Sequence, residues 1–139
     1  MSDPVQPFVY EKLKPEVKPL ILAALRDPDA EQTKGHLMDK SGMCCLGVIT
    51  ECAIKAGVQL RREWNDEEGE YTYLYNLPGR DYESMDSAVL PTPVREWAGL
   101  RTSDPFIGAE GDYHFSATTA NDLRGLTLPQ IADLIEENL

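Results

Sequence analysis

Hydrophobic positions near the start of the chain recur at three- and four-residue intervals. They share one face of a helix and comprise Leu13, Val17, Leu20, Ile21, Ala24 and Leu25. Pro15 and Pro19 lack a backbone donor, so the helix is predicted to begin near one of them and to end before Asp27. A second helix is predicted within residues 46–56, with Gly57 at its C-terminal end.

The middle of the chain changes to the two-residue alternation of β-strands. Residues 58–64 and 71–77 are predicted strands joined by a polar turn, and Tyr71, Tyr73 and Tyr75 should share one face. Upstream, residues 36–38 are predicted to pair with residues 43–46 across a Lys-Ser-Gly turn.

The last part of the chain contains the clearest helix signal. Thr127 and Gln130 form a capping-box pattern, with Pro129 in the first turn. The apolar stripe that follows consists of Leu128, Ile131, Leu134, Ile135 and Leu139. Before it, residues 76–87 are predicted to form a loop, residues 94–98 a short helix ended by Gly99, and residues 101–120 an irregular segment with one strand near residues 113–115.

These elements predict an α+β fold in which three or four helices pack on a small, mainly antiparallel sheet. Residues 1–139 should form a single domain, with residues 1–9 as an extended N-terminal lead-in. Trp64, Trp97 and Phe106 are predicted to join the apolar helix stripes in the core.

The charge of the chain limits its partners. Acidic residues number 24 against 13 Lys and Arg, which gives a formal net charge of −11. This argues against binding to duplex nucleic acid or to an anionic membrane, and it permits a basic host protein. The charge does not exclude a small anionic ligand, such as a nucleotide signal, in a local basic pocket, and it leaves homo-oligomers open.

The first residues are polar, and no stretch approaches the roughly 18–20 apolar residues that a membrane span needs. We therefore expect a cytoplasmic protein. Cys44, Cys45 and Cys52 do not have the spacing of a disulfide framework or a zinc site, and their apolar neighbours favour a buried structural role. Neither a metal site nor a cofactor is predicted, and no catalytic motif assigns a catalytic residue.

Two polar segments are the candidate ligand-binding site. Lys34 and His36 lie directly before a buried segment, which is a common position for a binding loop on a rigid scaffold. Asn121 and Asp122 form the second candidate loop, although residues of these types also commonly close turns. The acidic turn at residues 66–70 is interpreted as a solvated hairpin tip.

Three segments resemble a family of small proteins encoded by tailed bacteriophages and prophages. The first joins residues 31–37 to a Cys-Cys-Leu-Gly-Val segment at residues 44–48, and the second ends in Trp-Ala-Gly-Leu at residues 97–100. The third joins Asn121-Asp122 to the Ile-Ala-Asp-Leu-Ile-Glu helix at residues 131–136. The resemblance runs from about residue 20 to the end, with Ala120 where relatives usually have leucine. It implies a phage origin and no mechanism.

Three functions are compatible with this sequence. The first is a non-enzymatic phage accessory protein that acts in the host cytoplasm in counter-defence, by sequestering a nucleotide-type immune signal. The second is an acidic inhibitor that binds a basic host protein and imitates the charge of DNA. The third is a small enzyme of unknown reaction, which would need a polar cluster with perturbed pKa values in a cleft.

Overall fold

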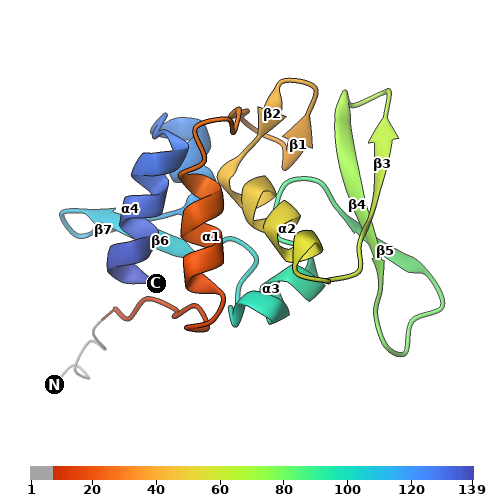
Figure 1. Ribbon diagram of the computed structural model, residues 1–139, viewed down its shortest axis with the longest axis horizontal. Coiled ribbons are helices and arrows are strands. Elements are labelled where there is room, and N and C mark those ends of the chain that lie inside the picture. The colour runs from red at the N-terminus through yellow and green to blue at the C-terminus, as the bar shows by residue number, and fades with distance from the viewer. Residues whose placement is uncertain (1–7) are drawn as a thin grey trace, which may run out of the picture.

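The computed structural model describes residues 8–139 and has the predicted α+β architecture (Figure 1). Its helices are α1 (Lys18–Leu25), α2 (Cys45–Lys55), α3 (Thr92–Ala98), the π-helical turn η1 (Thr119–Leu123) and α4 (Leu128–Asn138). Its strands are β1 (Met38–Asp39), β2 (Gly42–Met43), β3 (Arg61–Asn65), β4 (Glu70–Asn76), β5 (Glu83–Asp86), β6 (Phe106–Glu110) and β7 (Tyr113–Ser116). They pair antiparallel in three small sheets rather than in one, in the orders β1-β2, β3-β4-β5 and β6-β7.

Helix α1 begins beside Pro19, the second of the two prolines in this segment. Lys18 is its first residue and Pro19 lies in its first turn, where a missing N–H is harmless. The helix ends at Leu25, before Asp27 as predicted. Ile21 and Leu25 are fully buried, and the helix packs between α2 and α4.

Helix α2 begins earlier than the sequence pattern predicts, which corrects the predicted hairpin. Cys44 is extended, whereas Cys45 is already helical, so only β1 and β2 remain of the hairpin. The physical reason is tertiary: the side chain of Asn121 accepts a hydrogen bond from the Cys45 N–H at 3.1 Å and thereby caps the helix. Gly47 fits there because a Cβ would lie 1.8 Å from the Leu37 carbonyl oxygen.

The three-stranded sheet projects from one side of the helices in Figure 1. Tyr73 and Tyr75 are buried on its inner face, as the alternation predicts, and Tyr71 is half-buried. The Tyr73 hydroxyl donates to Glu51 of α2 at 3.0 Å, which attaches the sheet to the helices. Strand β5 lies inside the segment that was predicted to be a loop.

The C-terminal elements include the predicted last helix. Thr127 Oγ1 accepts from the Gln130 N–H at 3.2 Å, and Gln130 Oε1 accepts from the Thr127 N–H at 2.9 Å. Four stripe residues are buried, but Leu134 is only half-buried. The strand predicted near residue 113 is present as β7, and its partner β6 lies in a segment predicted to be irregular.

The core lies among α1, α2, α3 and α4, with further residues from the strands and η1. Of the three predicted aromatic core residues, Trp97 packs against this core, and none of the three is fully buried. Phe106 is 46% exposed, while Trp64 and Trp97 are half-buried. Trp64 lies near the β3–β4 turn because its indole N–H finds a polar partner there, in Asp66 at 2.6 Å. Phe106 instead contacts Phe8 edge-on at the surface, with ring centroids 5.7 Å apart.

Across residues 8–139, the helices are all too short or too polar to cross a lipid bilayer. Residues 1–7 of the predicted extended lead-in lie outside the described part of the chain.

Candidate functional site

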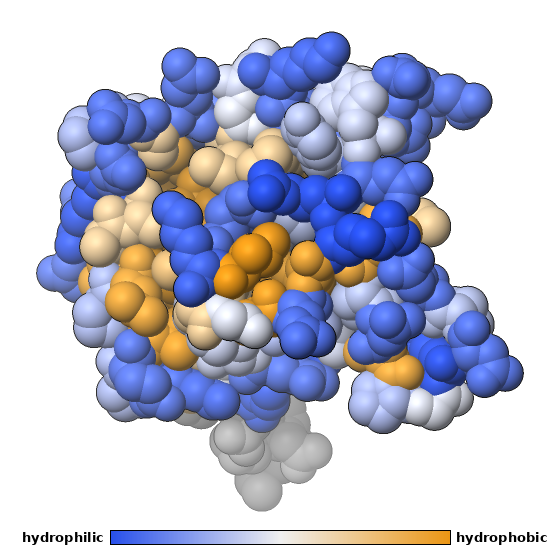
Figure 2. Space-filling model, turned by 45° about the vertical axis from the view of Figure 1, so that its right-hand side comes forward, coloured by the Kyte–Doolittle hydropathy of each residue, from blue (hydrophilic) through white to orange (hydrophobic). Residues whose placement is uncertain are grey.

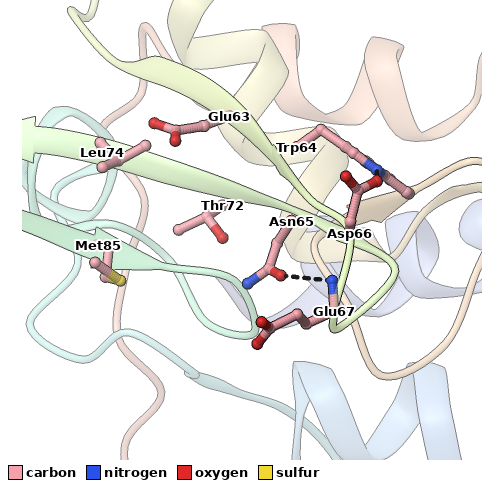
Figure 3. A pocket seen from close by; sticks show the side chains of 8 residues that line it. All are labelled: Glu63, Trp64, Asn65, Asp66, Glu67, Thr72, Leu74 and Met85. Atoms are coloured by element: carbon pink, nitrogen blue, oxygen red, sulfur yellow. Dashed lines mark hydrogen bonds between the residues drawn. The ribbon is translucent and has the colours of Figure 1, made fainter.

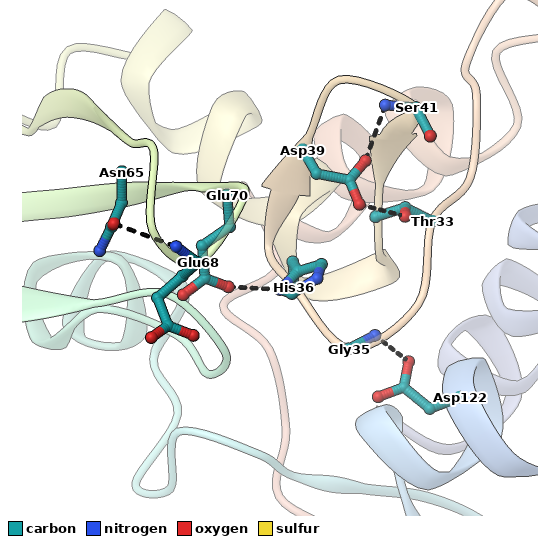
Figure 4. Close-up of polar contacts among 9 residues, drawn as sticks. All are labelled: Thr33, Gly35, His36, Asp39, Ser41, Asn65, Glu68, Glu70 and Asp122. Carbon is teal, nitrogen blue, oxygen red and sulfur yellow. Dashed lines mark hydrogen bonds and ion pairs between the residues drawn. The ribbon is translucent and has the colours of Figure 1, made fainter.

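The two predicted ligand-binding loops lie side by side (Figure 4). The Gly35 N–H donates to Asp122 Oδ1 at 3.1 Å, although 87 residues separate them. The Asn121 side-chain amide also donates to the Thr33 carbonyl oxygen at 2.8 Å. The fold therefore brings the two predicted ligand-binding segments into direct contact.

Asn121 is fully buried and uses all of its hydrogen-bonding capacity inside the protein. Its carbonyl oxygen accepts from Gln32 Nε2 at 2.8 Å and from the Cys45 N–H at 3.1 Å. Its amide nitrogen donates to the Thr33 carbonyl and to Asp122 Oδ1, both at 2.8 Å. An asparagine side chain has two donors and two acceptor sites, so this amide has no donor left for a ligand in this conformation.

The other three predicted site residues differ in how strongly they are engaged. Asp122 accepts from Gly35 and Asn121, which fixes its Oδ1 atom. His36 Nδ1 hydrogen-bonds to the Glu70 carboxylate at the start of β4. Lys34 is exposed and makes no ion pair with residues 8–139. Of the four, Lys34 has the freest side chain.

Asp39 fixes the shape of the loop that carries these residues. It accepts from Thr33 Oγ1 at 2.7 Å and from the N–H groups of Ser41 and Gly42 at 2.7 and 3.2 Å. Partial burial opposes ionisation, but the hydrogen bonds outweigh it and lower the pKa of Asp39 below its ordinary value of 3.8. The loop is thus anchored on its own carboxylate as well as on η1.

The cysteines have the burial of structural residues. Cys44 and Cys45 are buried, and Cys52 is half-buried. Burial raises the pKa of the Cys44 thiol to about 11 and that of Cys45 well above its ordinary value. Both thiols are therefore protonated near neutral pH, which is the opposite of what a nucleophilic cysteine needs.

A groove lies on the outer face of the three-stranded sheet and at its adjoining turn (Figure 3). Directly opposed residues of antiparallel strands share a face, so the pair Glu63 and Thr72 lies beside the pair Leu74 and Met85. The groove has a volume of about 330 Å³. It is lined by Glu63, Trp64, Asn65, Asp66, Glu67, Thr72, Leu74 and Met85.

The groove combines carboxylates with apolar surface, and the residues that line it include no Lys or Arg. Two cations lie next to it: Arg61 opposes Leu74 on the same sheet face, and Lys40 Nζ lies 4.8 Å from the centre of the Trp64 ring. Glu63 is paired with Arg61 at 2.8 Å, whereas Asp66 and Glu67 make no ion pair with residues 8–139. Met85 is 64% exposed, which is high for a large apolar side chain. Such a surface suits a cation with an aliphatic stem, such as a Lys or Arg side chain.

The β3–β4 turn presents these acids in a fixed arrangement. Asn65 Oδ1 accepts from the N–H groups of Glu67 and Glu68 at 3.0 and 3.2 Å, so the turn is held by its own first residue. The sequence identified this turn as acidic but did not identify the groove, because Met85 lies on β5, in a predicted loop. The local sequence around Met85 does not indicate that β5 pairs with β4, which is the pairing that places Met85 beside Leu74.

One further polar cluster lies between β4, β5 and the start of α3. The Tyr75 hydroxyl hydrogen-bonds to Asp86. Burial raises the pKa of both side chains. For Asp86, the hydrogen bond lowers the pKa, but burial outweighs it. The two residues connect neighbouring strands, and neither lines the groove. We therefore assign this pair to the attachment of β5 to β4.

The comparisons with known proteins identify a family. No curated protein and no solved structure matches this sequence. Residues 13–139 match the family described as Domain of unknown function (DUF8296). This match covers nearly the whole chain, and the protein therefore belongs to the DUF8296 family.

Proposed function

We propose that this protein is a non-enzymatic accessory protein of a tailed bacteriophage that acts in the host cytoplasm by binding and inhibiting a basic host protein. The observation that carries the proposal is the groove on the outer sheet face, where carboxylates and apolar side chains meet with no cation among the lining residues. Charge complementarity of this kind steers a basic partner to the surface and selects against acidic ones.

The supporting geometry has two parts. Met85 offers exposed apolar contact beside the nearly buried Leu74, while Asp66 and Glu67 offer charge that no ion pair with residues 8–139 neutralises. The net charge of −11 extends the attraction beyond the groove itself, up to about one Debye length of roughly 8 Å at physiological salt. Rows of carboxylates along a protein surface can also imitate the phosphates of DNA, which would explain inhibition of a nucleic-acid-binding protein.

The test is capture of host proteins by immobilised protein, with charge-reversed variants. One double variant, Glu67→Lys with Glu68→Lys, reverses the charge of two exposed residues whose side chains make no ion pair with residues 8–139. Asp112→Lys with Glu137→Lys changes the net charge equally at exposed positions outside the sheet. We expect a basic host protein to bind wild type and the control but not the first variant. Equal capture by both variants would contradict the proposal.

Sequestration of a nucleotide-type immune signal is the second candidate function. Its support is Lys34, an exposed cation on a loop that Asp39 and Asp122 hold in place. Calorimetry with cyclic and linear nucleotides tests it, and Lys34→Glu should then abolish binding with little change in melting temperature. Nucleotide binding by wild type without capture of a basic protein would favour this candidate over the first.

A further inference from the structure

A second hollow lies between α1 and α2, away from the sheet groove. Its volume is about 480 Å³. It is lined by Leu20, Ala23, Ala24, Asp27, Asp29, Ala30, Met43, Val48, Glu51, Cys52, Lys55 and Ala56. Figure 2 shows the side of the molecule towards the three-stranded sheet, where apolar side chains are exposed among hydrophilic ones.

Small side chains from α1 and from the C-terminal part of α2 line the hollow. Ala23 and Ala24 lie on α1, Cys52 lies on α2, and Ala56 directly follows the last residue of α2, one helical turn from Cys52. The small side chains fill little of the space beside them, which leaves the hollow open. Leu20 forms one wall of the gap and is 50% exposed, so an apolar surface is open to a partner.

The charges around the hollow are unevenly placed. Asp27 and Asp29 follow the C-terminal end of α1, where the partial negative charge of the helix adds to theirs. Glu51 is already engaged, since Arg62 lies 3.2 Å from it and Tyr73 donates to it. Lys55 is the one cation among the lining residues. Asp27 accepts a hydrogen bond from the Asp29 N–H at 2.9 Å, and neither aspartate makes an ion pair with residues 8–139. The acidic charge without an ion-pair partner is therefore concentrated at the end formed by Asp27 and Asp29.

We propose that this hollow, the α1–α2 groove, binds an amphipathic basic helix of a partner protein. The helix would place large apolar side chains over the alanines and a Lys or Arg beside Asp27 and Asp29. A helix suits the shape because a third helix can pack its ridge between two neighbouring ones. The complementary charge is basic, and a second copy of this chain would instead bring two charges of −11 together.

This inference stands apart from the sheet groove, and its test uses different residues. The probe is a synthetic amphipathic helix of roughly 18 residues, long enough to be helical, with leucine on one face and lysine on the other. A matched peptide carries glutamate in place of every lysine. Binding to the full chain is measured by calorimetry, and nuclear magnetic resonance shifts of backbone amides locate the contact.

Two variants change the groove and two matched variants do not. Ala23→Phe fills the hollow from an exposed position, and Ala88→Phe makes the same change at an exposed position outside it. Asp29→Lys reverses charge at the acidic end, and Asp81→Lys does so in the loop before β5. We expect the lysine peptide to shift amides of α1 and α2, with about tenfold or greater weakening in the first member of each pair only.

Several results would overturn the inference. Unchanged binding to both Ala23→Phe and Asp29→Lys would place the peptide elsewhere. Equal binding of the glutamate peptide would remove the role of charge. If the double variant Glu67→Lys with Glu68→Lys lost binding and the α1–α2 groove variants did not, the binding site of the peptide would be the sheet groove. A dimer of wild type that Ala23→Phe dissociates would make a second copy the occupant.

Discussion

Asn121 shows how one side chain determines the arrangement of several segments. Its amide connects Gln32, Thr33, Asp122 and the first turn of α2 through four hydrogen bonds. The sequence marked the Asn-Asp pair as notable because such residues close turns or bind ligands. It could not decide between these roles, since the partners lie up to 89 residues away.

Replacing Asn121 should therefore destabilise the fold strongly. Asn121→Ala leaves the Cys45 N–H and the Thr33 carbonyl without their partner, and we expect the free energy of unfolding to fall by about 3 kcal/mol. Asn76→Ala, at the exposed end of β4, should change it by less than about 0.5 kcal/mol. Urea denaturation followed by circular dichroism measures both. A loss for Asn121→Ala as small as that for Asn76→Ala would contradict this role.

Asp39 should make the free energy of unfolding depend on pH. Its pKa is lowered in the folded protein, so its stabilising effect is fully present above the ordinary value of 3.8 and is lost as the pH falls through the folded pKa. Asp39→Asn should cost about 1 kcal/mol near neutral pH, and this difference should shrink in acid. Denaturation curves between neutral pH and about pH 3 test it. A constant difference over that range would show that ionisation of Asp39 is irrelevant.

At the scale of elements, helix α4 is stabilised at its first turn and along its buried face. Thr127→Ala removes one half of the capping box and should reduce the free energy of unfolding by about 1 kcal/mol. Ile135→Ala should cost more, about 2–4 kcal/mol, because Ile135 is fully buried. Leu134→Ala is the matched control, because Leu134 is half-buried. Among the three variants, Ile135→Ala should lower the melting temperature most. Equal losses for Ile135→Ala and Leu134→Ala would contradict the burial assigned to these two residues.

The helices were more predictable than the strands for a physical reason. Helix ends depend on nearby residues, so Pro19, Gly99 and Thr127 marked α1, α3 and α4 in the sequence. Strands β5 and β6 are short and depend on partners elsewhere in the chain. Their segments contain glycine and polar residues, so no local alternation revealed them.

The same difference applies to the candidate sites. Sequence alone brought attention to the loops at Lys34 and Asp122, which the fold does bring together. It did not reveal the sheet groove or the α1–α2 groove, because both are hollows made by residues from separate elements. A hollow depends on which side chains are small and which elements meet, and neither is visible in a linear pattern.

For the molecule as a whole, the distribution of charge is the property that most constrains a partner. Arg61 pairs with Glu63 and Glu83, Arg26 with Asp133 and Glu136, and Arg124 with Glu110. These cations are therefore already used within the chain. Asp66, Glu67 and Glu68 of the β3–β4 turn make no ion pair with residues 8–139, which favours a basic partner over an anionic one.

The most direct test of this account is the affinity of the captured basic protein for wild type across a series of salt concentrations. Calorimetry or surface plasmon resonance would also measure Glu67→Lys with Glu68→Lys beside the control Asp112→Lys with Glu137→Lys. We predict that affinity falls steeply with salt, that the sheet variant loses binding by tenfold or more, at about 1.4 kcal/mol per factor of ten, and that the control binds nearly like wild type. An affinity that does not change with salt concentration, or one that is equal for the sheet variant and the control, would contradict the account.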